Sequence, residues 1–289
     1  MKTGAMIRII IWAVIALLLV GVLLYFLMGG SWPFGARTVG FGSSAHTEEP
    51  AAAERPQLEQ VNFSNVSKLE IHWISGGVTV ESASGEGGFS EDYSGQEKYR
   101  MDWYISGDTL VIEDFSKDLS GLLNINLPSK NLNVSLPRAM EEITVVTTSA
   151  EVTFTGGIET QKLDVSSVSG RVSGVLARAD EAKTETVSGS IDLVLGWCRD
   201  VDISTTSGGV GVACYQGLKE AELDSVSGSL DITIPKGSAY TLDWDTVSGG
   251  VYDDTGAGGG FGSGGTVEID AETVSGGLTI HSAAEQEMP

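Results

Sequence analysis

The chain has 289 residues, with 17 Lys and Arg against 39 Asp and Glu, and a formal net charge of −22 at pH 7. A surface this acidic repels phosphate backbones, which excludes nucleic acid as a partner. The same charge disfavours direct contact with anionic polymers unless divalent cations bridge the two surfaces.

The N-terminal segment predicts a membrane anchor. Lys2 and Arg8 precede an uncharged run at residues 9–28, which at about 1.5 Å per residue spans the ~30 Å hydrocarbon core of a bilayer. The alternative is a cleaved signal peptide, although the run exceeds the ~7–15 apolar residues typical of one. Because the basic residues come first, we expect residues 1–8 in the cytoplasm and the rest outside the cell.

Residues 29–60 predict a flexible tether. They are rich in Gly, Pro, Ala and Glu and include the stretch EEPAAAERP. Such a composition cannot bury an apolar core, so the segment links the anchor to a folded domain. The expected protein is therefore a single-pass protein of the cell membrane, with its C-terminal domain extracytoplasmic.

Residues 61–142 predict an irregular start to that domain. They contain strand-like runs and a Ser-Gly corner, Ser75-Gly76, that is detached from the regular series, while the Ser106-Gly107 pair is followed by apolar residues one position late. The apolar residues of NLNVSL alternate cleanly, and Pro128 and Pro137 each close a run where a strand should stop. Terminal repeats of stacked proteins are atypical because they must protect an open edge. We therefore expect an N-terminal cap of two or three irregular rungs.

The remaining part, residues 143–283, is an internal repeat. Ser-Gly pairs recur at intervals of 19, 19, 20, 21 and 27 residues, and a degenerate Ser-Ala copy lies 20 residues upstream of the first. Periods of this size indicate a repeat architecture in which one unit stacks on the next. The repeats are centred on Ser149, Ser169, Ser188, Ser207, Ser227, Ser248 and Ser275. A short tail, residues 284–289, follows.

Apolar residues alternate with polar ones on both sides of each Ser-Gly pair, which is typical of half-buried strands. Aligned on the Ser, the apolar columns lie six and four residues before it and three and five after it; Gly174 and Asp253 depart from the last column. We predict an all-β fold, a β-solenoid of about seven rungs of ~20 residues. The alternative is a β-sandwich of antiparallel hairpins. Glycine suits the corner because a positive φ costs it nothing.

The long final interval contains the stretch DDTGAGGGFGSGG at residues 253–265. It formally contains GxGxxG, but a dinucleotide site needs a helix after the motif, and a strand-like TVEIDAET follows here. We interpret this stretch as a flexible insertion. Cys198 and Cys214 lie in adjacent repeats, and the sequence leaves open whether they form a disulfide or remain thiols.

The runs KLEIHWISGGVTVES, GDTLVIED and NLNVSLPRAMEEITVVTTSAEVTF, followed by serial VSGS copies, resemble the bacterial "putative adhesin" family. The resemblance covers nearly all of residues 61–281. It implies an exported or membrane-anchored β-solenoid of the cell envelope. It implies no catalytic residues, because none are established for the family.

Acidic residues recur five and three positions before the corner Ser, on the face opposite the apolar columns. Stacked carboxylates could bind Ca²⁺, which takes six to eight oxygen ligands, but the nonapeptide of Ca²⁺-binding β-rolls is absent. We interpret the columns as a solvated face and assign no metal-ligating residue. They are Asp164, Asp202, Glu222, Asp243 and Asp270 in one column and Glu185, Asp224, Asp245 and Glu272 in the other.

No catalytic or cofactor-binding residue is assigned. The three histidines, His46, His72 and His281, accompany no recurring nucleophile, and the serines belong to the corner motif. We expect a non-enzymatic envelope protein that offers a rigid acidic surface to an envelope component or surface protein, for adhesion or scaffolding. One alternative is envelope-stress sensing with a membrane partner. Another, less favoured, is a polysaccharide-acting enzyme built on ladder carboxylates and on the bases Arg171, Arg178, Lys183 and Arg199.

Overall fold

The computed structural model describes residues 59–93, 95, 99–114, 129–256 and 267–283. The predicted anchor, all but the end of the predicted tether, residues 257–265 of the glycine-rich stretch and the predicted tail at residues 284–289 lie outside the described residues. Among the residues that are described, no helix has the length and apolar character needed to cross a membrane.

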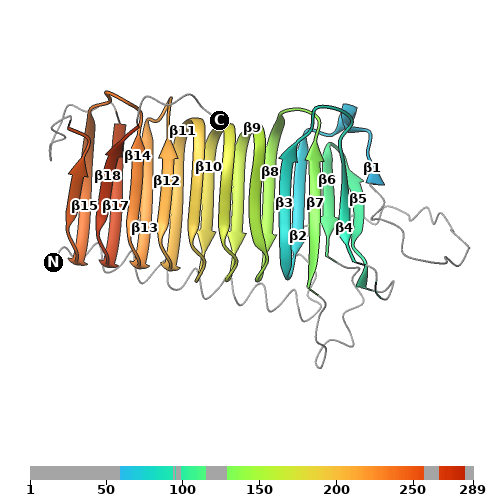
Figure 1. Ribbon diagram of the computed structural model, residues 1–289, viewed down its shortest axis with the longest axis horizontal. Helices are drawn as coiled ribbons and strands as arrows, with labels where there is room; N and C mark the ends of the chain where they lie inside the picture. The colour runs from blue at the N-terminus through green and yellow to red at the C-terminus, as the bar shows by residue number, and fades with distance from the viewer. Residues whose placement is uncertain (1–58, 94, 96–98, 115–128, 257–266, 284–289) are drawn as a thin grey trace, which may run out of the picture.

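The described chain is built almost wholly of strands, which lie side by side along the long axis of the molecule (Figure 1). A 3₁₀ turn at Phe63–Asn65 precedes the second strand. The strands are β1 (Glu59–Gln60), β2 (Lys68–Trp73), β3 (Gly76–Ser82), β4 (Gly88–Asp92), β5 (Asp102–Ser106), β6 (Thr109–Glu113), β7 (Lys130–Leu136), β8 (Met140–Thr147), β9 (Glu151–Ser167), β10 (Val172–Thr186), β11 (Ile191–Ser207), β12 (Val210–Cys214), β13 (Glu220–Ser227), β14 (Leu230–Ile234), β15 (Tyr240–Ser248), β16 (Val251–Asp254), β17 (Val267–Ser275) and β18 (Leu278–Ser282).

Two parallel ladders run the length of the stack. One contains the strands before each corner, in the order β6, β2, β8, β9, β10, β11, β13, β17 and β15. The other contains the strands after each corner, in the order β7, β3, β9, β10, β11, β12, β14, β18 and β16. The parallel pairing contradicts the sandwich of antiparallel hairpins and confirms a solenoid-like all-β fold.

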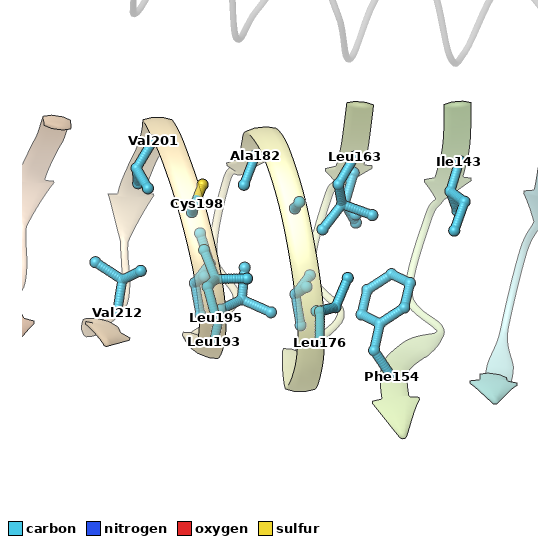
Figure 2. Packing of buried hydrophobic residues seen from close by; sticks show 14 of the residues in the cluster. Ile143, Phe154, Leu163, Leu176, Ala182, Leu193, Leu195, Cys198, Val201 and Val212 are labelled. Carbon is cyan, nitrogen blue, oxygen red and sulfur yellow. The ribbon is translucent and has the colours of Figure 1, made fainter. Parts of the chain in front are cut away.

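The apolar columns face one another between the two ladders, as the alternation predicts. Figure 2 shows Ile143, Leu163, Ala182 and Val201 aligned from rung to rung, opposite a second row that includes Phe154 and Leu176. All of these side chains are buried. Because each column position is shared by neighbouring rungs, the core is continuous and no rung buries its apolar face alone.

In the middle of the stack the strands are longer than a strand–corner–strand–loop repeat predicts. β9, β10 and β11 each run from the second half of one rung through the back turn into the first half of the next. Where β9 and β10 pass over this turn, the register shifts around Leu176. Gly174 interrupts its apolar column because it packs beside Phe154, where a Cβ would lie 2.3 Å from the Phe154 carbonyl oxygen.

The C-terminal rungs do not stack in sequence order. β17 and β18 pair with β13 and β14 on one side and with β15 and β16 on the other, so the last rung of the chain lies inside the rung before it. Asp253 explains this order: it occupies an apolar column position, in register with Ile280. A carboxylate there would be buried between two rungs, whereas on the outermost rung it is exposed.

At the N-terminal end, too, the rungs do not stack in sequence order. The first rung, β2 and β3, lies between β6–β7 on the outside and β8–β9 on the inside. Antiparallel strands then cover the outer edges, β5 along β6 and β4 along β7, with β1 along β4. Both ends therefore differ from a stack in chain order, and only the N-terminal end has antiparallel covering strands within the described residues.

The corner glycines are required by close stacking, which corrects the sequence interpretation. Among the glycines of the regular corners, only Gly208 has a positive φ, at 152°. A Cβ on Gly189 would instead lie 2.0 Å from the carbonyl oxygen of Gly170 in the next rung, and the other corner glycines show comparable contacts. No side chain fits at that distance, so the position excludes every residue with a Cβ unless the rungs separate.

A column of hydroxyl groups lines the inside of the corners, and the sequence analysis missed it. It lies two residues before each corner Ser and consists of buried Ser or Thr side chains for most of its length. Ser167 Oγ accepts a hydrogen bond from Gly170 N at 2.8 Å, and Thr186 Oγ1 accepts one from Gly189 N at 3.0 Å. These two hydroxyls satisfy corner amides that turn away from the ladder, whereas Gly208 N, Gly228 N and Gly276 N donate to backbone carbonyl oxygens of a neighbouring rung. The Ser or Thr that recurs at this position in every regular repeat is the sequence pattern that could have predicted this column.

The glycine argument predicts unequal effects at two glycines in neighbouring rungs. Gly189→Ala should lower the free energy of unfolding by about 2–4 kcal/mol, because the new Cβ forces neighbouring rungs apart. The matched control is Gly209→Ala, whose Cβ would meet only Ser229 Oγ at 3.6 Å. It should change stability by about 0.5 kcal/mol or less. Denaturant unfolding of the two variants measures the difference, and equal midpoints would contradict the stacking explanation.

Candidate functional site

The outward side of β13, β15 and β17 forms an acidic face. Because these strands alternate inward and outward, residues five and three before each corner Ser point away from the core. The parallel register then places Glu222 beside Asp270, and Asp224 beside Glu272. We use "acidic face" for the side chains Glu222, Asp224, Asp243, Asp245, Asp270 and Glu272.

Basic residues interrupt the same columns toward the N-terminal end. Lys183 occupies the column of Asp202 and Glu222, and its Nζ lies 2.8 Å from Glu185 Oε1 and 3.0 Å from Asp202 Oδ2. Burial lowers the pKa of Lys183, but the hydrogen bonds to these two carboxylates outweigh burial and the net shift is upward. Asp164 similarly contacts Lys162 at 3.6 Å. The predicted acidic columns thus divide into an ion-paired part and a part made of carboxylates alone.

Asp224 is the most perturbed carboxyl group of the acidic face. Burial raises its pKa from 3.8 to about 7, with further contributions from the negative charges of Glu222 and Glu272 and of more distant acids. The interpretation of a fully solvated column is therefore wrong at this position. Neighbouring strands lie about 4.8 Å apart, so the register itself forces like charges together.

A shallow depression of roughly 270 Å³ lies where the ion-paired part meets the carboxylates. Its lining includes Lys162, Lys183, Asp202 and Glu222. Across the residues described, no group of three or more His, Cys, Asp or Glu side chains is arranged to hold a metal ion. What the arrangement can do is electrostatic: it attracts cations and positively charged surfaces.

The bases considered for a polysaccharide-acting enzyme each contact acids of their own or a neighbouring rung. Arg171 Nη2 lies 2.5 Å from Asp192 Oδ2, and Arg199 contacts Glu181 and Asp200 at 2.9 and 2.8 Å. Of the histidines, His72 contacts Glu70 at 2.7 Å and His281 contacts Asp254 at 3.4 Å, while His46 lies outside the described residues. These pairs are distributed over the surface, and the fold does not bring them together into one cleft.

Both cysteines are buried thiols, and no disulfide joins them. Cys198 Sγ lies 3.3 Å from the carbonyl oxygen of Asp200. The thiol of Cys214 hydrogen bonds with that of Cys198, and this contact together with burial raises the pKa of Cys214 well above its ordinary value. The pair therefore packs inside the solenoid as apolar groups.

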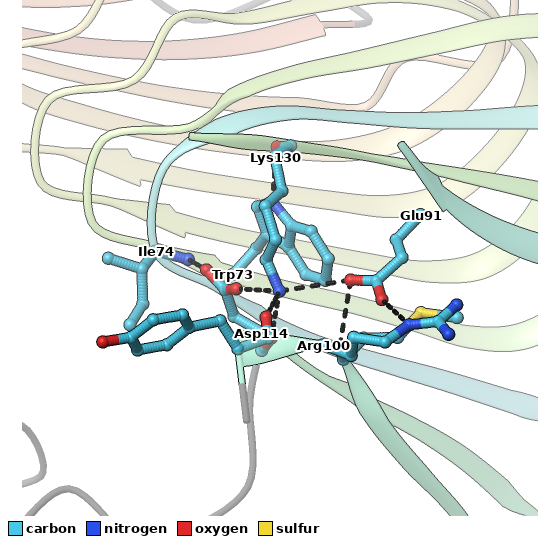
Figure 3. Close-up of polar contacts among 8 residues, drawn as sticks. Trp73, Ile74, Glu91, Arg100, Asp114 and Lys130 are labelled. Atoms are coloured by element: carbon cyan, nitrogen blue, oxygen red, sulfur yellow. Dashed lines mark hydrogen bonds and ion pairs between the residues drawn. The ribbon is translucent and has the colours of Figure 1, made fainter. Parts of the chain in front are cut away.

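One charged cluster escaped the sequence analysis entirely. Lys130, Glu91 and Asp114 meet in the N-terminal cap, where their side chains are 0, 1 and 4% exposed (Figure 3). They come from β7, β4 and the end of β6, and no repeat or spacing relates them in the sequence. They meet only because the N-terminal rungs stack out of sequence order and β4 packs antiparallel against β7.

The chain is similar to one protein family and to several solved structures. A family model described as Toastrack DUF4097 matches residues 75–281. Similar solved structures include a "putative cell adhesion protein" from Clostridium sporogenes, 14% identical, covering 79% of this chain and 99% of that one, with a TM-score of 0.41. A "putative adhesin" from Bacteroides fragilis is also 14% identical, covering 80% and 98%, with a TM-score of 0.43. No curated protein matches the chain.

Asp224 predicts a pH dependence of stability. Its folded-state pKa of about 7 exceeds the ordinary 3.8, so the folded protein binds a proton that the unfolded chain has lost. Stability should therefore fall as pH rises from about 4 to about 7 and stay level above that. Asp224→Asn should remove this loss and raise stability at pH 8 by at most about 4 kcal/mol.

Thermal unfolding between pH 4 and 8 tests this prediction. The control is Asp243→Asn, on the exposed outermost rung, which should shift the melting temperature less. An Asp224→Asn variant whose stability falls with pH as steeply as that of the wild type would contradict the assignment.

Proposed function

The chain belongs to the Toastrack DUF4097 family, and we propose that it is a non-enzymatic, membrane-anchored protein of the cell envelope that presents an acidic surface for adhesion or scaffolding. Membership confirms the resemblance to the "putative adhesin" family found in the sequence. The family itself has no established activity, so the proposal rests on the surface of this chain.

The acidic face is the observation that supports this function. Its carboxylates are aligned by strand register, so they form ordered rows on a stiff ladder. Burial, and after it the charges of Glu222 and Glu272, raise the pKa of Asp224, so holding its carboxylate in this row lowers stability. A face that served only solubility could disperse the same charges over more of the surface. Rows of fixed carboxylates suit a partner of opposite charge.

We infer a partner that offers positive charge along one side, such as a basic protein surface of the envelope. Electrostatic complementarity of this kind increases association rates and selects partners, and it weakens as salt is added. Residues 9–28 would hold the protein in the membrane, with the solenoid outside the cell. The tether would then allow the acidic face to reach its partner.

Cross-linking from the surface tests the role of the acidic face. A photoreactive side chain in place of Asp243, on that face, should capture an envelope component in living cells, and added salt should reduce the yield. The control position is Asp231, which lies on the other ladder with 47% of its side chain exposed. Capture from Asp231 but not from Asp243 would contradict a partner on the acidic face. Capture of a membrane protein with a cytoplasmic output domain would favour stress sensing over adhesion.

Protease accessibility tests the proposed topology. Protease added to intact cells should cut the tether within residues 29–60 and release a compact fragment of about residues 61–283, because paired strands resist cleavage. Detergent-permeabilised cells provide the control for protease activity. Complete protection of the tether in intact cells, with cleavage after permeabilisation, would place the domain in the cytoplasm.

A further inference from the structure

The buried cluster of Lys130, Glu91 and Asp114 has no part in the proposed function. Lys130 continues the column of corner positions onto the outermost N-terminal rung, where it is in register with Gly76. Its ammonium group lies 3.2 Å from Glu91 Oε2 and 2.6 Å from Asp114 Oδ1. Removing three charged side chains from water is costly, and a buried ion pair adds little stability in return.

The contacts around Asp114 orient its carboxyl group toward the lysine. Oδ2 accepts a hydrogen bond from Ile74 N at 3.0 Å. Oδ1 is buried and faces the lysine, with Lys130 Nζ 2.6 Å away as its ion-pair partner. The carboxyl carbon is one C–O bond, about 1.2 Å, from Oδ1, so it lies no more than about 3.9 Å from Nζ. Near-attack distances are about 3–3.5 Å.

Further contacts keep the lysine in this position. Nζ also donates hydrogen bonds to the carbonyl oxygens of Tyr99, at 2.6 Å, and of Asp114. Nζ lies 4.8 Å from the centre of the Trp73 ring and 5.5 Å from that of Tyr93. The Trp73 indole in turn donates to the Lys130 carbonyl oxygen at 3.1 Å. The amine is therefore fixed and shielded from water, which is the condition for a high effective concentration, about 10⁵–10⁸ M in well-oriented cases.

We propose that the folded chain joins Lys130 to Asp114 through an amide bond between Nζ and the side-chain carboxyl carbon. One proton passes from the ammonium group to the carboxylate, leaving a neutral amine and a neutral acid. Nζ attacks the carbon, the N–C bond forms, the bond from the carbon to Oδ1 breaks, and one water molecule leaves. Oδ2 remains as the amide oxygen, still held by Ile74 N–H. No oxidant, reductant or co-reactant is needed.

Glu91 is placed to move the proton. Its Oε2, which is 3.2 Å from Nζ, accepts the second proton from the attacking amine and passes it to the departing oxygen. Glu91 ends the reaction ionised, as it began. Arg100 Nε and Met101 N, which donate to its two oxygens at 3.1 and 2.9 Å, then hold its charge without the lysine. The product thus has two fewer buried charges than the ion pair.

The pKa of Asp114 agrees with this chemistry. Burial raises it above the ordinary value and outweighs the opposing effect of Lys130, while the charge of Glu91 raises it further. A raised pKa favours the neutral carboxylic acid, which is the form that an amine can attack.

The bond would strengthen the part of the solenoid that the tether enters. It joins the end of β6 to the start of β7, the two strands of the outermost N-terminal rung. In a stacked fold an end rung has one neighbour and separates first. A covalent link across that rung would keep it closed when the chain is pulled through residues 59–68.

Peptide mapping of the purified full-length protein tests the bond. Trypsin cuts after Arg100, Lys117 and Arg138, so Asp114 and Lys130 fall on separate peptides, residues 101–117 and 118–138. We expect these two peptides to remain joined after denaturation, with a combined mass lower by one water molecule and no cleavage after Lys130. Two separate peptides, with normal cleavage after Lys130, would overturn the proposal and leave an ion pair.

Variants separate the reaction from the fold. Glu91→Gln keeps the shape of the side chain but cannot accept the proton, so the joined peptide should be lost or form far more slowly while unfolding stays cooperative. Asp114→Ala should abolish it. The matched control is Lys183→Arg, which alters a surface lysine with two carboxylate contacts and should leave the joined peptide intact. A joined peptide that persists at wild-type level in Glu91→Gln would overturn the role of Glu91.

Discussion

The close approach of successive rungs at the glycine corner is the constraint on which the rest of the structure depends. Where a Cβ on Gly170, Gly228 or Gly276 would stand, the carbonyl oxygen of the next rung lies only 1.8–1.9 Å away. This contact sets the vertical alignment of every repeat, and beneath it the hydroxyls of Ser167 and Thr186 accept hydrogen bonds from the corner amides of Gly170 and Gly189. With the corner aligned, the apolar columns on both sides stack without further adjustment.

The same alignment brings together groups that repel. Register places Leu223 beside Ala271 in the core and, by the same pairing, Asp224 beside Glu272 on the surface. Burial, and after it the charges of Glu222 and Glu272, raise the pKa of Asp224, so the ionised carboxylate is disfavoured in the folded protein. A repeat fold has no means of separating its outward columns once its inward columns are in register. The register fixes where the outward side chains lie, but Lys183 in the same column as Asp202 and Glu222 shows that it does not require them all to be acidic.

The two ends of the solenoid meet the problem of open edges in different ways. At the N-terminal end, β5 and β4 cover the outer rung with antiparallel strands, and the Lys130 cluster lies beneath them. At the C-terminal end the outermost rung exposes Val247 and Tyr252 and places Asp253 at a position that is apolar elsewhere. An acid and partly polar strands at an edge oppose pairing with another chain.

Local pattern was enough to predict the strands, the inward columns from Ile143 to Ile280, and the outward acidic columns, because alternation and period are written in single repeats. The sequence also departs from the repeat pattern at Asp253 and in the 27-residue interval. In the structure both departures adjoin the rung that lies at the end of the stack. The order of the rungs, the reason for the corner glycines and the meeting of Lys130 with Glu91 and Asp114 depended on the tertiary structure. Each of these depends on which segments, separated by dozens of residues in the chain, become neighbours in space. Steric contact and burial between rungs decide this, and the local sequence pattern does not.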